Sequence, residues 1–364
     1  MKRILILSHT GNVSDFKIGS HHYANVLASK NYEVHYSGVP RTMFHRLFKR
    51  QPTGSNKLIK EVKFISLKAL FPITIKYNLF LSYLNTLYDR FFRREVYYDL
   101  ILCDYPFFLP YLTKIKYGKL IYRPTDDYYT FSGDKVVHYE KLIIQMSDLV
   151  ISTSSQVKES LWSRYSTEIE SSKLKIEVIS NGYDDSIFKK THSVKERENA
   201  VYVGAIDGRF DFSLLQALAN KYKFIFFNIY GPYNKDYDSV IKDIVHKHAN
   251  VIFHGPLEYG SIPKVLNEHK VGLLLLSKND SNKGRSPMKL WEYLACGLNV
   301  FCPSNNVSEQ LFGMGIYNYT NDEDALILFE NVYTQPSPDN DSIFNNSWQV
   351  KVERLIKISG LDVI

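Results

Sequence analysis

Short apolar runs alternate with amphipathic segments of helical length along the first half of the chain. Each run is long enough for a strand, and each intervening segment is long enough for a crossover helix. The predicted strands are Arg3–Ser8, Glu33–Ser37, Leu100–Cys103, Lys119–Tyr122, Leu149–Ser152 and Ile176–Ile179. Helices are predicted over Ser20–Ser29 and from Ser154 to about Tyr165. Because parallel strands need such crossovers, the pattern predicts a parallel sheet covered by helices.

The same alternation restarts after a polar stretch, Lys189–Asn199, which we interpret as a linker. The second set of predicted strands is Ala200–Val203, Phe224–Ile229, Val251–Phe253, Val271–Leu276 and Asn299–Phe301, with helices at Phe212–Lys221, Ser261–Glu268 and Met288–Ala295. The sequence thus predicts an α/β protein with two doubly wound, Rossmann-like domains, residues 1–190 and 191–345. We expect the domains to face each other across a cleft, with ligands at the carboxyl ends of the strands. A last helix within residues 346–364 is expected to cross back to the first domain.

Length and composition agree with two folded domains. The chain has 364 residues, of which 45% are hydrophobic, and it contains no uninterrupted apolar run of the length that a membrane span needs. The apolar run near the N-terminus, Ile4–Leu7, is too short for a signal peptide. The three cysteines show no metal-binding spacing, which favours reduced thiols in a cytoplasmic protein.

Positive charge is concentrated in the first half of the chain. Residues 1–190 hold 28 basic and 18 acidic residues, and within residues 41–100 the counts are 12 and 4. That window is also rich in aromatic residues: Phe44, Phe48, Phe71, Tyr77, Phe80, Tyr83, Tyr88, Phe91, Phe92, Tyr97 and Tyr98. Basic and large apolar side chains together suit an anionic membrane surface, so we expect peripheral binding to the inner face of the cell membrane. The pattern would also suit nucleic acid, and a solvated basic face is the simpler alternative; we predict no nucleic-acid partner.

The segment from Ser286 to Val300 carries the most specific chemical pattern. A polar loop leads to Pro287, a favoured first helical residue, and Arg285 and Lys289 add positive charge where a helix start offers free N–H groups. This arrangement suits a diphosphate. Glu292 lies almost one turn further on the same face, where it can accept hydrogen bonds from ribose hydroxyls. The alternative is an ordinary amphipathic helix with a surface Lys–Glu pair.

This segment resembles the donor-sugar-binding helix of GT-B glycosyltransferases. The resemblance is strongest to bacterial exopolysaccharide enzymes typified by the xanthan β-glucuronosyltransferase (glycosyltransferase family 70, distantly family 4). Four further segments fit the resemblance in the right order: Ser14–Lys17 with Ala24–Asn25, Ile121–Asp126, Asn181–Asp184 and Val201–Ile206. Together they span most of the chain and imply the GT-B fold.

The resemblance implies a base-catalysed, inverting transfer. Retaining enzymes of family 4 usually carry two glutamates eight positions apart; with Glu292 as the second, the first position holds Gly284. In an inverting reaction a carboxylate takes the proton of the acceptor hydroxyl. The resemblance carries this role onto Asp126, which follows the strand Lys119–Tyr122; the alternative is that Asp126 caps a turn. No metal or other cofactor is expected, because Lys289 and Arg285 can stabilise the leaving diphosphate.

The remaining site residues also follow from the resemblance. The expected nucleotide-sugar contacts are Gly204, Ile206, Tyr230, Pro256, Leu257, Arg285, Met288, Lys289 and Glu292. Contacts to the acceptor or to phosphate are expected at Asp15, His21, His22 and Arg123, with His9 in the same region; structural roles are the alternative for the histidines.

The predicted function is transfer of a sugar from a UDP-sugar to a lipid-linked or polysaccharide acceptor. Glucuronic acid or another hexose is the expected sugar, and exopolysaccharide or capsule synthesis is the expected process. Two alternatives share the fold: a UDP-sugar 2-epimerase and a non-catalytic nucleotide-sugar-binding protein. An NAD-dependent dehydrogenase fits poorly, because no G-x-G-x-x-G follows the first strand.

Overall fold

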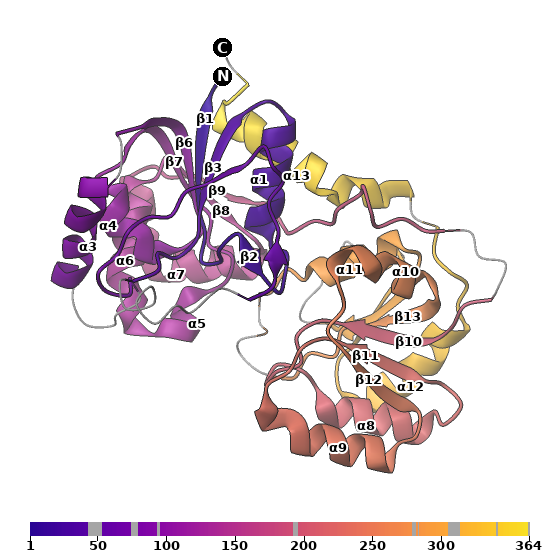
Figure 1. Ribbon diagram of the computed structural model, residues 1–364. Coiled ribbons are helices and arrows are strands. Elements are labelled where there is room, and N and C mark those ends of the chain that lie inside the picture. Colours follow the sequence, from indigo (N-terminus) through magenta and orange to yellow (C-terminus); the bar gives the residue numbers. More distant parts are fainter. Residues whose placement is uncertain are drawn as a thin grey trace. The chain divides into compact units, whose positions relative to one another are not determined.

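The computed structural model describes residues 1–42, 53–73, 79–92, 95–191, 196–278, 282, 284–304, 314–339 and 341–362. The chain divides into two compact units (Figure 1). The first unit consists of Met1–Ser180 and Lys351–Ile364, and the second consists of Asn181–Val350. Across the described residues, no helix is long and apolar enough to cross a membrane.

The first unit is built on a sheet in which all neighbouring strands are parallel. Its order is β5-β3-β1-β6-β7-β8-β9. The strands are β1 (Arg3–Leu7), β3 (Glu33–Ser37), β5 (Lys63–Phe64), β6 (Tyr97–Cys103), β7 (Lys116–Tyr122), β8 (Leu149–Ser152) and β9 (Ile176–Val178). A small antiparallel pair, β2 (Val13–Ser14) and β4 (Ser55–Asn56), lies beside the loop that follows β1. The parallel sheet confirms the predicted α/β class for this half of the chain.

Helices connect these strands. They are α1 (Gly19–Ser29), α3 (Leu79–Phe92), α4 (Leu109–Leu112), α5 (Tyr128–Ser132), α6 (Asp134–Met146) and α7 (Ser155–Ser171). Two predicted helix ends were wrong. Helix α1 begins at Gly19, and Ser20 lies inside it, where its buried hydroxyl contacts Ser8 Oγ at 2.8 Å. Helix α7 continues to Ser171, past a non-helical residue at Tyr165.

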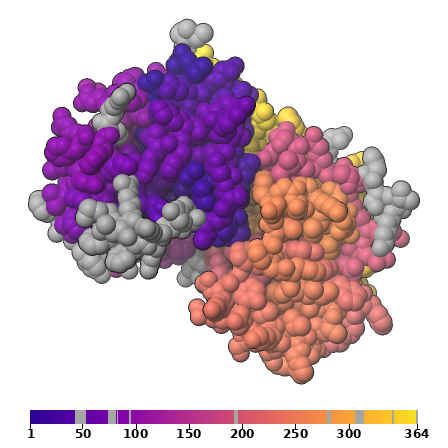
Figure 2. Space-filling model, viewed as in Figure 1, coloured from indigo at the N-terminus to yellow at the C-terminus, as the bar shows by residue number. Residues whose placement is uncertain are grey.

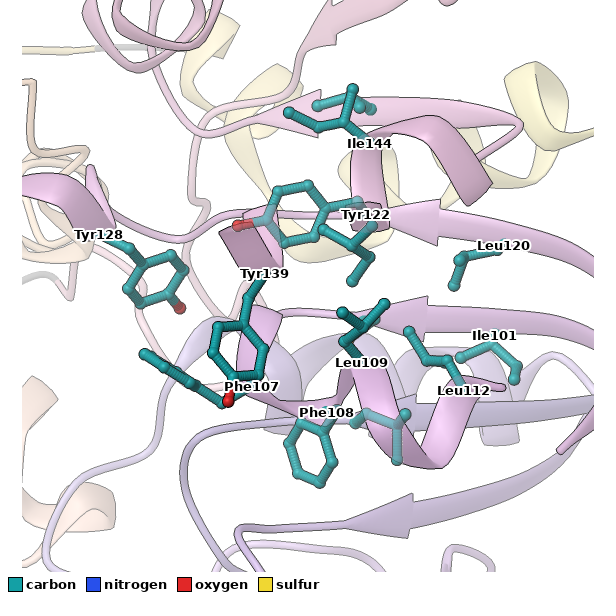
Figure 3. Close-up of a cluster of buried hydrophobic side chains, with 14 of the residues drawn as sticks. Ile101, Phe107, Phe108, Leu109, Leu112, Leu120, Tyr122, Tyr128, Tyr139 and Ile144 are labelled. Atoms are coloured by element: carbon teal, nitrogen blue, oxygen red, sulfur yellow. The ribbon is translucent and has the colours of Figure 1, made fainter. Parts of the chain in front are cut away.

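A core rich in aromatic side chains packs against one face of this sheet (Figure 3). Leu120 and Tyr122 of β7 contribute to it, together with Phe107, Phe108 and Tyr139 from the covering helices. Fully burying one such side chain stabilises the folded state by about 1.5–3 kcal/mol. The core therefore fixes the positions of β6 and β7, and with them the points at which the loops after these strands begin.

The second unit repeats the architecture with another parallel sheet. Its order is β12-β11-β10-β13-β14-β15. The strands are β10 (Glu198–Val203), β11 (Phe227–Tyr230), β12 (Val251–Gly255), β13 (His269–Leu273), β14 (Asn299–Pro303) and β15 (Ile316–Tyr319). The helices are α8 (Phe212–Lys221), α9 (Asp238–Lys247), α10 (Ile262–Asn267), α11 (Met288–Ala295) and α12 (Asp322–Thr334). The predicted strand start at Phe224 was wrong, because that side chain is 97% exposed and the strand begins at Phe227.

The chain passes from one unit to the other earlier than the predicted boundary at residue 190. Residues 181–190 belong to the second unit. Tyr183 N donates to Asn346 O at 3.2 Å, and Trp348 N donates to Tyr183 O at 2.9 Å. A Cβ on Gly182 would lie 2.6 Å from Asn346 O, so only glycine permits this close approach. The boundary between the two units is therefore set by backbone pairing with a segment far along the chain. That pairing cannot be read from the sequence.

The last helix, α13 (Trp348–Ser359), continues from the second unit into the first. Lys119 Nζ donates to Ser359 O at 2.7 Å, and Lys2 Nζ donates to Leu361 O at 2.9 Å. The two ends of the chain therefore lie side by side in the first unit, as Figure 1 shows, and the space-filling view places C-terminal yellow next to N-terminal indigo (Figure 2).

A buried ion pair joins the carboxyl ends of β6 and β7. Arg123 Nε donates to Asp104 Oδ1 at 2.9 Å, and Nη2 donates to Oδ2 at 2.7 Å; neither residue is exposed. The guanidinium also lies over the Tyr23 ring, 4.7 Å from its centre. Tyr128 Oη donates to Asp104 O at 2.6 Å, which ties the start of α5 to the same point. This pair fixes the loop after β7 to the end of β6.

Replacing Arg123 with Met should destabilise the protein strongly. The substitution keeps most of the side-chain volume but leaves the Asp104 carboxylate buried without its partner, which typically costs about 3–5 kcal/mol. Urea unfolding followed by circular dichroism measures the loss. Lys116→Met, which removes one side of an exposed pair with Glu95, is the control and should cost about 0–1 kcal/mol. Equal, small losses in the two variants would contradict the structural role of the buried pair.

Candidate functional site

Chemically competent side chains gather at the carboxyl end of each parallel sheet. In the first unit we define the Asp126 edge as His9, Asp104, Tyr105, Arg123 and Asp126. These residues follow β1, β6 and β7, which are neighbours in the sheet. Ligands of doubly wound proteins bind at such edges.

Asp126 and Asp127 have different surroundings although they are adjacent. The Asp127 side chain caps α5 by accepting from Tyr129 N at 3.1 Å, and it also binds Ser160 and pairs with Arg164 of α7. Asp126 is half-buried, and Thr125 Oγ1 donates to its Oδ2 at 3.3 Å. Asp127 therefore has a structural role. Asp126 is the member of the pair that contributes a partly exposed carboxylate to the edge.

Three of the four residues predicted to contact the acceptor or phosphate, His21, His22 and Arg123, are buried, and the predicted contacts stay predictions. His21 Nδ1 accepts from Ile18 N at 3.1 Å, and its Nε2 contacts Gly11 O at 2.8 Å, so both ring nitrogens bind the backbone. Burial lowers the pKa of His21 to about 4 and the pKa of His22 well below its usual range. Arg123 pairs with Asp104 through Nε and Nη2. Asp15, between β2 and α1, is exposed.

His9 lies at the same edge, two residues after β1. The residue is exposed, and its ring lies 6.2 Å from the Tyr105 ring. Desolvation by the surrounding protein lowers the pKa of His9, while the negative charges of Asp104 and Asp126 act in the opposite direction. His9 was noticed in the sequence only as one of three nearby histidines, and Asp104 was missed. Their common signal is the position directly after an apolar strand.

In the second unit, basic side chains surround the start of α11. We define the Lys289 cluster as Gly204, Asp207, Arg209, Arg285 and Lys289. A Cβ on Gly204 would lie 2.3 Å from Lys289 Cε and 2.8 Å from its Nζ, so the lysine lies directly against the backbone at the end of β10. Burial lowers the pKa of Lys289 to about 8, and Arg285 and Arg209 act in the same direction.

Carboxylates in the same region limit this accumulation of positive charge. Glu292, with only 6% of its surface exposed, raises the pKa of Lys289. Arg209 Nε donates to Asp207 Oδ1 at 3.0 Å, and the two side chains form an ion pair. Arg209 was missed in the sequence, although its place in the glycine-containing loop after β10 is a usable signal. The predicted contact of Glu292 with a ribose stays a prediction.

Hydrogen bonds from distant segments position the start of α11. Asn181 N donates to Ser286 Oγ at 2.9 Å, and Asn181 Nδ2 donates to Ser286 O at 2.8 Å. Pro287 precedes the helix with φ −72° and ψ 119°, so Met288, not Pro287, is the first helical residue. Gly297 ends the helix with a φ of +78°, a conformation that favours glycine. The helix start is thus held by residues of its own unit.

The ends of β11 and β12 form a flat aromatic surface. The rings of Tyr230 and His254 are stacked, with centres 4.2 Å apart and planes at 7°. His254 Nε2 contacts Asn228 Oδ1 at 2.8 Å. Pro256 is exposed and Leu257 is half-buried close by in the chain. Such a surface can stack against a planar ring.

Two other predicted nucleotide contacts have backbone or packing roles. Ile206 is buried, and its N–H donates to Pro232 O at 3.0 Å. Gly204 N donates to Tyr230 O at 2.8 Å, and a Cβ on Gly231 would lie only 1.6 Å from Gly204 O. These contacts pack the loops after β10 and β11 tightly against each other. Met288 is half-buried on the first turn of α11.

The start of α11 combines the groups that can bind an anion such as a diphosphate. A helix start supplies N–H groups, and Lys289, Arg285 and Arg209 supply positive charge close to it. In the part of the chain that the structure describes, no three metal-ligating side chains are grouped as a metal ion would require.

Comparison with known proteins supports this interpretation. Residues 212–332 match the model of a family described as "Glycosyl transferase-like". No curated protein matches the sequence.

Several solved structures have the same fold across the whole chain. Sucrose-phosphate synthase from Thermosynechococcus elongatus has a TM-score of 0.67 and 13% identity, covering 100% of this chain and 97% of that one. Anabaena Alr3699/HepE, solved in complex with UDP and glucose, has a TM-score of 0.68, 14% identity and full coverage of both chains. The lipopolysaccharide outer core galactosyltransferase WaaB, in its apo form, has a TM-score of 0.64 and 14% identity, again with full coverage of both.

The predicted fold class is confirmed: the chain has two Rossmann-like domains with parallel sheets, and its structural neighbours are GT-B glycosyltransferases. The resemblance to family 70 in particular stays a prediction. The family match to the second unit and the neighbours' fold together support the prediction that the chain is a glycosyltransferase of the GT-B superfamily.

Proposed function

We propose that this chain transfers a sugar from a UDP-sugar to a lipid-linked or polysaccharide acceptor, with inversion at the anomeric carbon. In this proposal the second unit binds the nucleotide and the first unit supplies the base. Glucuronic acid or another hexose is the transferred sugar, and surface polysaccharide synthesis is the process. The reaction needs no metal ion.

The observation that carries the proposal is the position of Lys289. A lysine whose ammonium lies against the backbone of Gly204, at the start of a helix and with a pKa near 8, is partly desolvated before any ligand binds. Desolvated cations interact strongly with a negatively charged group, and a leaving diphosphate gains such charge in the transition state. Arg285 and Arg209 extend the same positive region. This favours a nucleoside diphosphate as the leaving group.

The choice of UDP rests on two arguments. One of the similar structures was solved with UDP and glucose. The stacked Tyr230 and His254 rings offer a planar surface at the strand ends next to the Lys289 cluster, and backbone groups in the adjacent loops can bind a base edge. A UDP-sugar 2-epimerase would use the same half of the protein. The family match favours transfer over epimerisation.

The base in this proposal is Asp126. Its carboxylate lies at the carboxyl end of β7, partly exposed, while Asp127 is committed to the α5 cap and to Arg164. An acceptor hydroxyl that attacks the anomeric carbon must lose its proton in the transition state, and a carboxylate within hydrogen-bond reach assists that loss.

Peripheral attachment to an anionic membrane is the proposed setting, with α3 as the contact. Tyr83, Leu87 and Phe91 recur at four-residue intervals, hence on one helix face, and are 37%, 52% and 87% exposed. Arg90 is exposed in the last turn of the same helix. Other parts of the basic, aromatic window, including Phe44, Phe48 and Tyr77, lie outside the described residues. Apolar side chains flanked by positive charge favour a lipid surface.

Lys289→Ala should weaken UDP binding by about 10–100-fold, because a hydrogen bond to a charged group contributes about 1.5–3 kcal/mol. Isothermal titration calorimetry with UDP measures the loss. Wild-type affinity should also fall as pH rises above about 8, since the ammonium then loses its proton. Lys247→Ala, at an exposed pair on α9, is the matched control. Unchanged UDP affinity in Lys289→Ala would remove the basis of the proposal.

Asp126→Asn should reduce UDP release from the preferred UDP-sugar by about 10²–10⁴-fold, with a membrane lipid extract as the acceptor source. UDP affinity should stay normal, because the Lys289 cluster belongs to the other unit. Asp127→Asn is the control; asparagine still caps a helix, so turnover should change less. Proton NMR of the product should show a β-linkage from an α-linked donor. A retained anomeric configuration, or near-normal turnover of Asp126→Asn, would contradict the role of Asp126 as the base of an inverting transfer.

The double variant Leu87→Ser with Phe91→Ser should bind anionic vesicles at least about tenfold more weakly, since burying one large apolar side chain contributes about 1.5–3 kcal/mol. Vesicle co-sedimentation measures the binding, which should also fall at high salt. The control, Ile327→Ser with Phe344→Ser, removes two exposed apolar side chains of the second unit and should have no effect. Equal binding of both variants would argue against α3 as the membrane contact.

A further inference from the structure

The Asp126 edge also contains an aromatic ring, that of Tyr105, which proton removal does not require. Tyr105 is the second residue after β6, the middle of the three strands that end at this edge. Its carbonyl oxygen accepts from Cys103 Sγ at 3.3 Å and from Phe108 N at 3.2 Å, so the position of its backbone is fixed. The side chain is only half-buried, and part of it is therefore open to solvent.

Four aromatic rings surround Tyr105 and hold its orientation. The ring centres of Phe107 and Tyr128 lie 5.1 and 5.4 Å from that of Tyr105. Those of His9 and Phe108 lie 6.2 and 6.3 Å away. The interplanar angles run from 54° to 77°, so none of these four rings stacks flat on Tyr105. A ring held in this way loses little side-chain freedom when a ligand packs on it.

A chain of contacts joins this ring to the proposed base. Tyr128, whose ring lies against Tyr105, has its hydroxyl 2.9 Å from Thr125 Oγ1. Thr125 Oγ1 in turn lies 3.3 Å from Asp126 Oδ2. The same Tyr128 hydroxyl donates to Asp104 O at 2.6 Å, which fastens it to the end of β6. The aromatic ring and the carboxylate therefore belong to one connected group of side chains.

The charges at this edge favour an uncharged ligand group over a phosphate. Arg123 pairs with Asp104 through two hydrogen bonds, so the two charges offset each other. Desolvation lowers the pKa of His9, which leaves its imidazole neutral at pH 7. Arg123 and His9 thus offer a phosphate no surplus positive charge, and the carboxylate of Asp126 repels it.

A pyranose ring matches the groups that the edge presents. Its faces carry C–H bonds, which pack favourably on an aromatic ring because the face of such a ring is electron-rich. Its hydroxyls lie around the rim of the ring, where they can donate to a carboxylate. A lipid phosphate has neither feature. An aromatic ring in the same group as a carboxylate can therefore bind a sugar unit by its face and by one of its hydroxyls.

We propose that Tyr105 determines acceptor specificity by stacking on a sugar unit whose hydroxyl lies against Asp126. This inference rests on the proposed function and narrows it, because the group that receives the transferred sugar is then a hydroxyl of a pyranose ring. The hydroxyl oxygen forms its bond to the anomeric carbon of the donor and gives its proton to Asp126. The bond from that carbon to the diphosphate oxygen breaks, and its electron pair leaves with the diphosphate. Tyr105 itself touches none of the reacting atoms.

The first test measures acceptor binding without turnover. Saturation-transfer NMR on the full chain, with UDP present, uses octyl glucoside, octyl galactoside and octyl mannoside below their micelle concentrations. At least one of them should bind and receive saturation at its sugar C–H protons. Tyr105→Leu should weaken that binding by about 3–10-fold, because it removes the aromatic face. Tyr105→Phe keeps the ring and should bind like the wild type. Tyr105→Trp enlarges the ring and should bind at least as tightly.

Two controls separate the ring from its surroundings. Tyr97→Leu, at a 54% exposed tyrosine at the amino end of the same strand, should leave glycoside binding unchanged. Octyl phosphate has the same chain with a phosphate in place of the sugar, and it should compete at least about tenfold more weakly than the glycoside that binds. Equal competition by octyl phosphate, or equal losses in Tyr105→Leu and Tyr105→Phe, would overturn the inference. So would a wild-type protein that binds none of the three glycosides.

The second test uses turnover, which a structural defect would change differently. The donor is the most active of UDP-glucose, UDP-galactose and UDP-glucuronic acid, and a membrane lipid extract supplies the acceptor. Tyr105→Leu should raise the amount of extract needed for half-maximal UDP release by about 3–10-fold. The maximal rate should fall by less than about twofold, because stacking acts on binding. A lower maximal rate at unchanged half-saturation would mean that Tyr105 only supports the fold of the edge.

UDP affinity, measured by calorimetry on the same variants, distinguishes this inference from the proposed function. Tyr105→Leu should bind UDP normally, because the Lys289 cluster belongs to the other unit. Normal UDP binding and transfer in the wild type, with unchanged acceptor binding in Tyr105→Leu, would reject the role of Tyr105 alone. A wild-type protein that binds no UDP and transfers no sugar would reject the proposed function itself.

Discussion

The buried ion pair between Asp104 and Arg123 is the constraint on which the first unit's chemistry depends. The two opposite charges, neither of them exposed, offset each other through two parallel hydrogen bonds. The pair locks the loop after β7 to the end of β6. Asp126 then lies at the sheet edge, and Asp127 caps the start of α5. A loop held only by surface contacts would not separate two adjacent carboxylates so clearly.

The second unit depends on close backbone approach. Glycines at 204, 231 and 272 let Lys289, the loop after β10 and the Tyr293 ring come nearer than any Cβ would permit. Val203 N donates to Tyr293 Oη at 2.8 Å, which fastens α11 to the sheet at the same level. As a result, the start of α11 and the lysine on its first turn are held against the strand ends. The positive region is built before a ligand arrives, so little reorganisation is needed on binding.

The two units carry opposite charges at the carboxyl ends of their sheets. The first unit presents the partly exposed carboxylate of Asp126, which is suited to accepting a proton. The second unit presents cations whose mutual repulsion, together with burial, lowers the pKa of Lys289. A bound anion would relieve that repulsion, because it would replace the missing counter-charge. The proposed reaction assigns base chemistry and leaving-group stabilisation to separate sheets, each at the end where its parallel strands stop.

The sequence alone determined the class of fold and the two most informative residues. Apolar runs of strand length are visible without a structure, so the parallel sheets were predictable, and Asp126 and Lys289 stood out because one follows such a run and the other opens a helix. Burial was not visible in the sequence. His21, His22 and Arg123 are all buried. The backbone binds the His21 ring, and Asp104 binds Arg123. Arg209 and Asp104 were missed for the converse reason. Their significance lies in which strand end lies next to which, and strand order is decided by packing between residues far apart in the chain. The same holds for residues 181–190, which belong to the second unit because Tyr183 pairs with Asn346 and Trp348.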